Sequence, residues 1–272
     1  MHALDAKAAQ RGPLQGLGIV VTRPARQSTA LVQRLASLGA TPIAFPAIVI
    51  LPPSDRSALD RAHANLDRYD FAVFVSANAV EYGAPDPARW PAHLLALAPG
   101  PGTADALIGC GIVNVVTPTT RFDSEGLLEL TALANVAGKR AIIFKGEYGR
   151  DLIAAALRKR GASVDDVICY RRARPQASAD GLLESMREGR VHAVTITSSE
   201  GLDNLAHVVG DEGRMLLTRI PLFVPHPRIV AYAKSLGFTP IETAGADAGL
   251  LAGLLEWSRT LRPSILDPKP DH

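Results

Sequence analysis

Cysteine, net charge and long apolar runs are all scarce in this sequence, and each scarcity excludes a class of protein. The two cysteines, Cys110 and Cys169, have no CxxC spacing and no clustered histidines, so we expect buried thiols rather than a metal site or a disulfide framework. Lysine and arginine total 29 against 27 acidic residues, without a block of like charge, which argues against a nucleic-acid partner. The composition favours a small or locally bound partner.

Membrane and nucleotide signatures are missing as well. No run of about 18 apolar residues predicts a membrane span, and the first residues, MHALDAKAAQRGPLQG, lack the apolar core of a signal peptide. We therefore expect a soluble, cytoplasmic protein without membrane contact. The chain has no GxxxxGK[ST], no GxSxG, and no GxGxxG at a strand end followed by an acidic residue, so neither a nucleotide cofactor nor a hydrolase nucleophile is indicated.

What the sequence does contain is an internal repeat of strand–helix units. FVSANAVEY (74–82) nearly returns as ITSSEGLDN (196–204), 122 positions later. The repeat covers more than this motif: Gly18 and Arg140, and Gly39 and Gly161, share the same offset, and Pro101 and Pro227 are 126 apart. Because short β-branched runs alternate with helical patterns in a chain of 272 residues, we predict two α/β domains with doubly wound, flavodoxin-like parallel sheets.

The turns that follow the predicted strands are the candidate ligand sites, because the carboxyl ends of parallel strands form the ligand crevice. Small or hydroxylated residues there leave backbone N–H groups accessible at a helix start, where the dipole favours anions by roughly 0.3–1 kcal/mol per contact. Six such turns suit a ligand with several carboxylates or phosphates. Ordinary helix capping is the alternative for the serines, and for His226 the alternative is a plain polar residue before Pro227 at a helix start. The turns supply Thr22, Arg23, Ser76, Ala77, Asn78, Gly102, Thr103, Lys145, Gly146, Arg150, Ser198, Ser199, His226 and Arg228.

The sequence resembles the uroporphyrinogen-III synthases, the cyclases of tetrapyrrole biosynthesis, over residues 16 to about 257. An ordered set of segments carries the resemblance: VTRPARQSTALVQRLASLGATPIAFPAI, YDFAVFVSANAV, PGTADALIGCGI, FDSEGLLEL, GKRAIIFKGEYGRDLIAAALRKRGASVDDVICYRR and HAVTITSSEGLDNL. It adds Ser124 to the candidate binding residues. The chain departs from the family pattern where the family often has Gly-Pro and then Thr, at His226-Pro227 and Ile229, and where it often has Arg, at Lys145.

The resemblance also implies how the two halves combine. The first strand–helix unit of the chain joins the later units, which gives an outer domain of residues 16–50 plus 172–260 around an inserted domain of residues 53–170. Two crossing strands, 46–50 and 167–172, would join these domains, with the active site in the cleft between them. Residues 1–15 and 261–272 are expected to be flexible tails.

The substrate implied by the resemblance is hydroxymethylbilane, a linear tetrapyrrole with eight carboxylates, which is cyclised with inversion of its last ring. A pyrrole nitrogen expels the terminal hydroxyl, a spiro intermediate forms and fragments, and the ring recloses, without a cofactor or metal. Orientation would supply much of the catalysis, an effect that can reach roughly 7–11 kcal/mol.

Tyr170 corresponds to the tyrosine considered in this family to help the hydroxyl leave, and its alternative role is that of a core aromatic. A monomer and transient contact with the preceding pathway enzyme are further expectations. A competing interpretation is a non-catalytic two-domain sensor that closes on a polycarboxylate or a phosphorylated small ligand.

Overall fold

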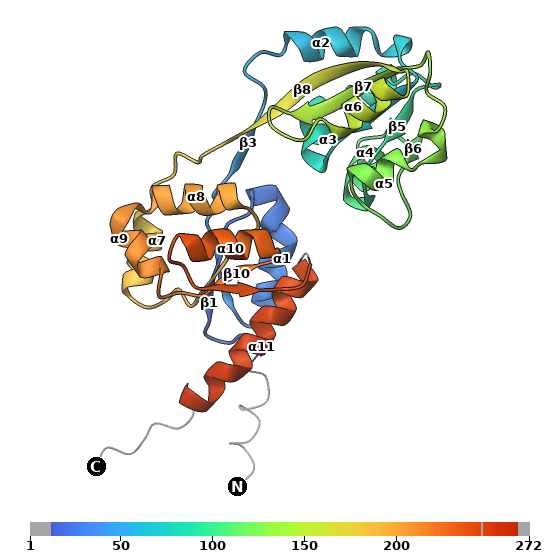
Figure 1. Cartoon of the computed structure of the whole chain (residues 1–272). Helices are drawn as coiled ribbons and strands as arrows, with labels where there is room; N and C mark the ends of the chain where they lie inside the picture. The colour runs from blue at the N-terminus through green and yellow to red at the C-terminus, as the bar shows by residue number, and fades with distance from the viewer. Residues whose placement is uncertain (1–11, 246, 266–272) are drawn as a thin grey trace, which may run out of the picture. The chain divides into compact units, whose positions relative to one another are not determined.

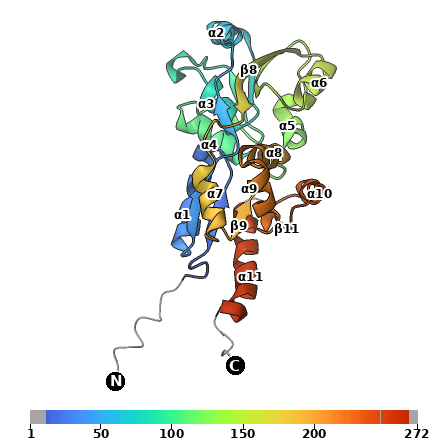
Figure 2. The ribbon, with the colours of Figure 1, turned by 90° about the vertical axis from the view of Figure 1, so that its left-hand side faces the viewer.

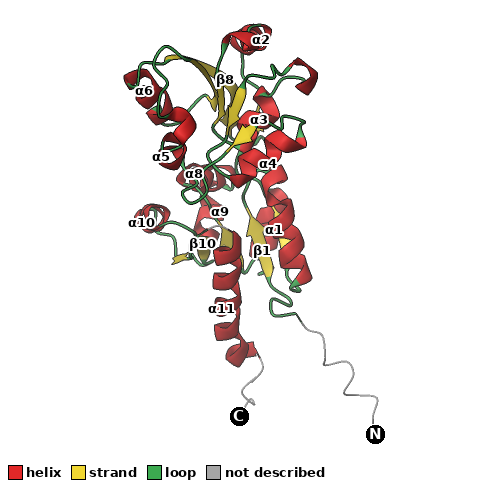
Figure 3. Cartoon of the chain, turned by 90° about the vertical axis from the view of Figure 1, so that its right-hand side faces the viewer, coloured by secondary structure: helices red, strands yellow, loops and turns green. Residues whose placement is uncertain are grey.

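The computed structural model describes residues 12–245 and 247–265 (Figure 1). Its contacts divide the chain into two compact units. Unit 1 comprises the described residues up to Val49 together with those from Arg174 onward, and unit 2 comprises Ile50–Ala173. Each unit is an α/β layer structure in which strands lie between helices (Figure 3). Among the described residues, no helix combines the length and apolar character that a membrane crossing needs.

The sheet of unit 1 has five strands in the order β11-β10-β9-β1-β2. β1 pairs in parallel with both β2 and β9, so the blue N-terminal segment lies among the orange and red C-terminal elements (Figures 1 and 2). The unit consists of β1 (Gly18–Val21), α1 (Ala25–Ser37), β2 (Thr41–Ala44), α7 (Asp180–Arg187), β9 (Ala193–Thr195), α8 (Ser199–Val208), α9 (Gly210–Leu217), β10 (Leu222–Val224), α10 (Pro227–Ser235), β11 (Pro240–Glu242) and α11 (Asp247–Ile265).

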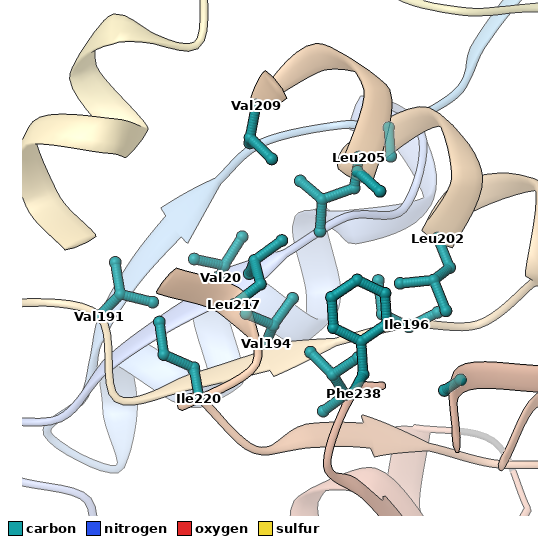
Figure 4. Packing of buried hydrophobic residues seen from close by; sticks show 14 of the residues in the cluster. Val20, Val191, Val194, Ile196, Leu202, Leu205, Val209, Leu217, Ile220 and Phe238 are labelled. Atoms are coloured by element: carbon teal, nitrogen blue, oxygen red, sulfur yellow. The ribbon is translucent and has the colours of Figure 1, made fainter. Parts of the chain in front are cut away.

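Both faces of this sheet are covered, because successive side chains of a strand point to opposite faces. Ile19 and Val21 of β1 pack in the cluster that contains apolar residues of α1 and α11. Val20 packs on the other face, with residues of α7, α8, α9 and α10. Figure 4 shows this second cluster, in which Leu205 of α8 and Leu217 of α9 lie with Val20.

The sheet of unit 2 has six strands in the order β3-β8-β7-β4-β5-β6, and the pairs from β8 to β6 are parallel. Phe74 and Phe144 stack face to face with ring centroids 4.6 Å apart on the side covered by α2, α3 and α4. The opposite face packs against α5 and α6. The unit consists of β3 (Val49–Leu51), α2 (Ser57–Ala64), β4 (Phe71–Phe74), α3 (Ala77–Gly83), β5 (Leu95–Leu97), α4 (Pro101–Gly109), β6 (Val115–Val116), α5 (Ser124–Leu128), β7 (Arg140–Gly146), α6 (Leu152–Lys159) and β8 (Ser163–Ala173), with short 3₁₀ turns at Leu66–Arg68, Pro87–Arg89 and Thr131–Leu133.

The glycines of the sequence repeat close the helices of corresponding units. Gly39 follows α1 and Gly161 follows α6, with φ of 90° and 87°. The next amide in each case bonds back to the helix, from Ala40 to the carbonyl of Leu35 and from Ala162 to that of Leu157. This is the Schellman arrangement, whose left-handed residue is usually glycine because a Cβ would be strained there. The same arrangement ends α4 and α10 at Gly111 and Gly237.

Two sequence expectations differ from the structure, the start of one strand and the burial of one cysteine. The proposed strand 46–50 is shorter, because Pro46 has no N–H to donate and Ala47 donates to the carbonyl of Thr22, so β3 begins only at Val49. Cys169 is buried, and burial raises the pKa of its thiol to about 12, whereas Cys110 is only half-buried.

The chain ends differ as well. Within the expected tail 1–15, Leu14 is fully buried and its amide donates to the carbonyl of Leu38, while residues 1–11 lie outside the described residues. At the other end α11 continues to Ile265, past the expected boundary at 260, and residues 266–272 lie outside the described part.

The glycine closing α10 provides a test of this backbone requirement. A Cβ at Gly237 meets nothing within 4 Å, so Gly237→Ala adds only the strain of φ +82°, and we expect a loss of about 1–2 kcal/mol in unfolding free energy. Gly181 in α7 also has open space but no positive φ, so Gly181→Ala should be neutral or stabilise by up to about 1 kcal/mol. Equal urea midpoints for the two variants would contradict the Schellman account.

Candidate functional site

In unit 1, the sheet order brings three of the predicted turns to one edge. β10, β9 and β1 are neighbours and parallel, so the turns after them begin side by side. Thr22, directly after β1, donates from its hydroxyl to the carbonyl of Thr195 at the end of β9, at 2.6 Å. Ser198 and His226 occupy the two other turns. The structure therefore gathers residues that lie far apart in the sequence.

Two of these turns use their polar side chain as a helix cap. The Ser198 hydroxyl oxygen accepts from the amide of Gly201 at 3.0 Å, and His226 Nδ1 accepts from the amide of Arg228 at 3.1 Å. The capping role that was the alternative for Ser198 is thus present, and His226 caps its helix as well. Ser199 is the first residue of α8. The amides of the first turn of a helix have no backbone acceptor within the helix, and here the Ser198 cap supplies an acceptor for one of them.

The two arginines of the unit 1 turns differ in their exposure. Arg23 forms an ion pair with Asp247 at the start of α11, and its side chain is 17% exposed. Arg228 is exposed in the first turn of α10. Arg23 therefore ties the turn after β1 to α11, a role that the sequence did not indicate.

Unit 2 repeats the arrangement at β7, β4 and β5, which are also parallel neighbours. Ser76 caps α3, and its hydroxyl oxygen accepts from the amide of Ala79 at 3.2 Å. Ala77 and Asn78 form the first turn of this helix, with Ala77 exposed.

The first turn of α4 contains an exposed residue next to a buried one. Gly102 is exposed, and a Cβ there would meet nothing within 4 Å. Thr103 is buried, as is Ile229 at the corresponding position of unit 1. Thr103 is therefore a packing residue in this structure, and Gly102 marks the accessible part of the turn.

Tyr170 and Ser76 meet across an intervening strand. The order β8-β7-β4 places β7 between them, and the Tyr170 hydroxyl lies 3.3 Å from the Ser76 hydroxyl oxygen. Tyr170 is only 4% exposed. A register shift between Lys145 and Gly146 pairs Gly146 with Tyr170, and a Cβ on Gly146 would lie 2.7 Å from Cζ of the Tyr170 ring. The absence of a side chain at Gly146 is what lets the ring reach Ser76.

Lys145 forms ion pairs with two carboxylates at this edge. The Lys145 ammonium donates to Asp151, and the Asp166 carboxylate lies 4.0 Å away. The Lys145 side chain is 17% exposed. Its hydrogen bond lowers the pKa of the Asp151 carboxyl from the ordinary value, so Asp151 is ionised at neutral pH. Lys145 is a cation whose charge is already balanced within the chain.

A pocket of about 120 Å³ opens beside this pair, with Ser124, Lys145, Gly146 and Arg150 among its lining residues. The Arg150 guanidinium donates to the carboxylate of Glu125 at 3.0 Å, and the Arg150 side chain is largely exposed. This contact joins the start of α5 to the turn after β7. Four of the predicted site residues therefore line one pocket.

Sequence reasoning missed several polar partners of these residues. Asp123, rather than Ser124, caps α5 by accepting from the amide of Gly126 at 2.8 Å. An aspartate placed three residues before that amide is a recognisable capping signal. Asp151 and Asp247 offered no such signal, because their partners are set by the loop path and by tertiary packing.

The contact between Gly146 and Tyr170 generates a prediction. Gly146→Ala should destabilise the protein by about 1–3 kcal/mol, because the added methyl must displace the tyrosine ring. Gly109→Ala is the matched control, since Gly109 is exposed and a Cβ there has open space. Denaturant unfolding measures both. A Gly146→Ala protein as stable as the control would show that the ring does not depend on this glycine.

Comparisons with known proteins agree with this fold. The model of the family described as uroporphyrinogen-III synthase HemD matches residues 29–250. The uroporphyrinogen-III synthase of Salmonella typhimurium is 34% identical over 235 residues, which cover 84% of this chain and 95% of the relative. The uroporphyrinogen-III synthase of Synechococcus elongatus is 30% identical over 260 residues, which cover 91% and 97% of the two chains.

Solved structures show the same fold. A mutant uroporphyrinogen III synthase of Thermus thermophilus is 20% identical, with a TM-score of 0.55 over 91% of this chain and 99% of the other. The uroporphyrinogen-III synthetase of Helicobacter pylori is 14% identical, with a TM-score of 0.56 over 90% and 100%. The resemblance seen in the sequence is therefore confirmed, and the chain belongs to the uroporphyrinogen-III synthase family.

Proposed function

We propose that this chain cyclises hydroxymethylbilane with inversion of ring D to give uroporphyrinogen III, a lyase step of porphyrin and heme biosynthesis. The observation that carries the proposal is the family match over residues 29–250, joined by relatives that are named as synthases over most of their length. These names do not favour the sensor interpretation. Two sets of three helix starts, one set per unit, are consistent with a substrate that carries eight carboxylates.

Carboxylate binding is assigned to the turns at the carboxyl edge of each sheet. The capping side chains of Ser76, Ser198 and His226 each satisfy one amide, and the helix dipole adds attraction for an anion at the same end. Gly102 offers backbone without a side chain in the way. Backbone binding of this kind suits a flexible polyanion, because it holds many carboxylates without needing a separate cationic side chain for each.

Arg150 is the cation best placed to change partners. Its pair with Glu125 is exposed, and exposed pairs contribute only about 0–1 kcal/mol, so a substrate carboxylate can replace Glu125 at little cost. Lys145 and Arg23 are less exposed and already paired, which supports a role for them in holding their turns. This division of roles is part of the proposal.

Tyr170 is assigned the role of assisting departure of the terminal hydroxyl. The pyrrole nitrogen pushes electrons toward the breaking carbon–oxygen bond while the phenol donates a hydrogen bond to the departing oxygen. The position of Ser76 is compatible with this assignment, because its hydroxyl lies 3.3 Å from the Tyr170 hydroxyl and either group can be the donor. The aid is partial, since the leaving group departs from an electron-rich ring.

The expected organisation belongs to the same proposal. Residues 16–50 plus 172–260 and residues 53–170 are proposed as the outer and inserted domains of a cytoplasmic monomer. Transient contact with the enzyme that makes hydroxymethylbilane would limit the time in which the substrate closes without inversion.

Incubation with freshly prepared hydroxymethylbilane tests the function directly. The protein should convert the substrate at many turnovers to the type III isomer, whereas the same mixture without protein gives the type I isomer. Saturable substrate binding with type I product alone would support the sensor and overturn the cyclase.

Replacing Tyr170 separates its chemical role from its contact with the cap. Tyr170→Phe should fold and still form mainly type III, with kcat reduced by about 100-fold or less, because general acid aid contributes about 10²–10⁴-fold and this leaving group needs little. Ser76→Ala should act chiefly on stability, by about 1 kcal/mol through loss of the cap. If the double variant has the kcat of Ser76→Ala alone, the tyrosine acts only by supporting the cap.

The accessible turn at Gly102 tests backbone binding. Gly102→Leu should raise KM by about 2- to 5-fold, the loss expected for one contact at a helix start, while Gly102→Ala should do less. Gly109→Leu, at an exposed position near the end of the same helix, should leave KM unchanged. Equal KM values for all three variants would remove α4 from the binding surface.

A further inference from the structure

Unit 2 exposes two aromatic side chains at the carboxyl edge of its sheet. Among the described residues, the large apolar side chains that are exposed are Ile108, Val113, Phe122, Tyr148, Ile168 and Met215. Phe122 is 55% exposed and follows β6, and Tyr148 is 77% exposed and follows β7. Both aromatic members of this set therefore lie in loops at the edge where the proposed carboxylate sites are.

Phe122 lies in a loop that is ordered by hydrogen bonds. Its neighbours on both sides are tied together, because Arg121 Nε donates to the Asp123 carboxylate at 2.8 Å while Asp123 caps α5. The loop is also close-packed, since a Cβ on Gly126 would lie 1.9 Å from the Arg121 carbonyl oxygen. Full burial of a phenylalanine side chain contributes roughly 1.5–3 kcal/mol to stability, and the half-exposed Phe122 side chain gains only part of this free energy.

Phe122 also lies against the start of α4. A Cβ built on Gly100, the residue that precedes this helix, would lie 3.1 Å from Cβ of Phe122. A carboxylate at the α4 start would hang from a pyrrole ring on a short acetate or propionate arm. The ring is then held within reach of the phenylalanine face.

Tyr148 lies at a pocket of the same unit. It lines the pocket that also contains Lys145, Ser124 and Arg150. The Arg150–Glu125 contact joins its loop to the start of α5, the helix that directly follows Phe122. One aromatic side chain thus accompanies each of two neighbouring anion-binding positions.

We propose that Phe122 and Tyr148 form an aromatic rim on unit 2 that contacts the pyrrole rings of the substrate and so fixes their orientation. The inference rests on the proposed function and deepens it, because helix starts recognise carboxylates but leave each ring free to rotate about its arm. Stacked or edge-on aromatic contacts have preferred geometries, which limits that rotation. The rim residues are positioning residues and take no part in proton transfer.

Steady-state kinetics with hydroxymethylbilane tests the rim. Phe122→Ala and Tyr148→Ala should each raise KM by about 2- to 12-fold, the range of one aromatic contact, and should increase the type I fraction. Phe122→Tyr should restore the wild-type KM, and Phe122→Leu should not, because leucine keeps apolar volume without a ring. Val113→Ala is the matched control, since Val113 is a 79% exposed apolar side chain that precedes β6 and so lies at the opposite edge.

The outcomes separate this inference from the proposed function. Wild-type protein that forms no type III isomer refutes the function, and the rim with it. Wild-type activity with Phe122→Ala and Tyr148→Ala kinetics equal to those of Val113→Ala refutes the rim alone. Full rescue by Phe122→Leu also refutes it, because the contact would then be merely apolar. Thermal unfolding of each variant shows whether a changed KM accompanies a folded protein.

Discussion

Parallel pairing of neighbouring strands is the constraint on which the rest of this structure depends. In a parallel sheet all carboxyl ends lie at one edge, so β10-β9-β1 in unit 1 and β7-β4-β5 in unit 2 each bring three strand-to-helix turns together. The helices that follow then begin at that edge, so the backbone N–H groups of their first turns lie there. Two diverged copies of one arrangement thus place several helix starts at a sheet edge, and we propose that these helix starts bind anions.

The Tyr170 contact shows how backbone detail positions a polar side chain at this edge. The phenol extends from β8 across β7 to the residue that caps the helix after β4, and only the missing side chain of Gly146 leaves room for the ring. Charge at the same edge is arranged in pairs, in which the Lys145 side chain is 17% exposed and the Arg150 side chain is 67% exposed. We propose that the exposure of the cation distinguishes Lys145, which holds a turn, from Arg150, which can exchange partners.

The sequence predicted what depends on local pattern. Alternating strands and helices indicated parallel α/β sheets, and the paired glycines, such as Gly39 and Gly161, mark corresponding helix ends. It did not predict contacts that depend on register or packing: the meeting of Ser76 and Tyr170, 94 residues apart, follows from a shift at Gly146. Leu14 looked like part of a tail because a single apolar residue in a polar segment has no periodicity, yet it is buried against the unit 1 core.

We propose that the helix starts at the carboxyl edge of each sheet bind substrate carboxylates. Amide hydrogen exchange with and without uroporphyrin III, a stable octacarboxylate that cannot turn over, tests this claim most directly. We predict slower exchange at the starts of α4 in unit 2 and of α8 and α10 in unit 1, with no change at the opposite sheet edges. Protection confined to one unit, or located at the loops that precede the strands, would contradict the account.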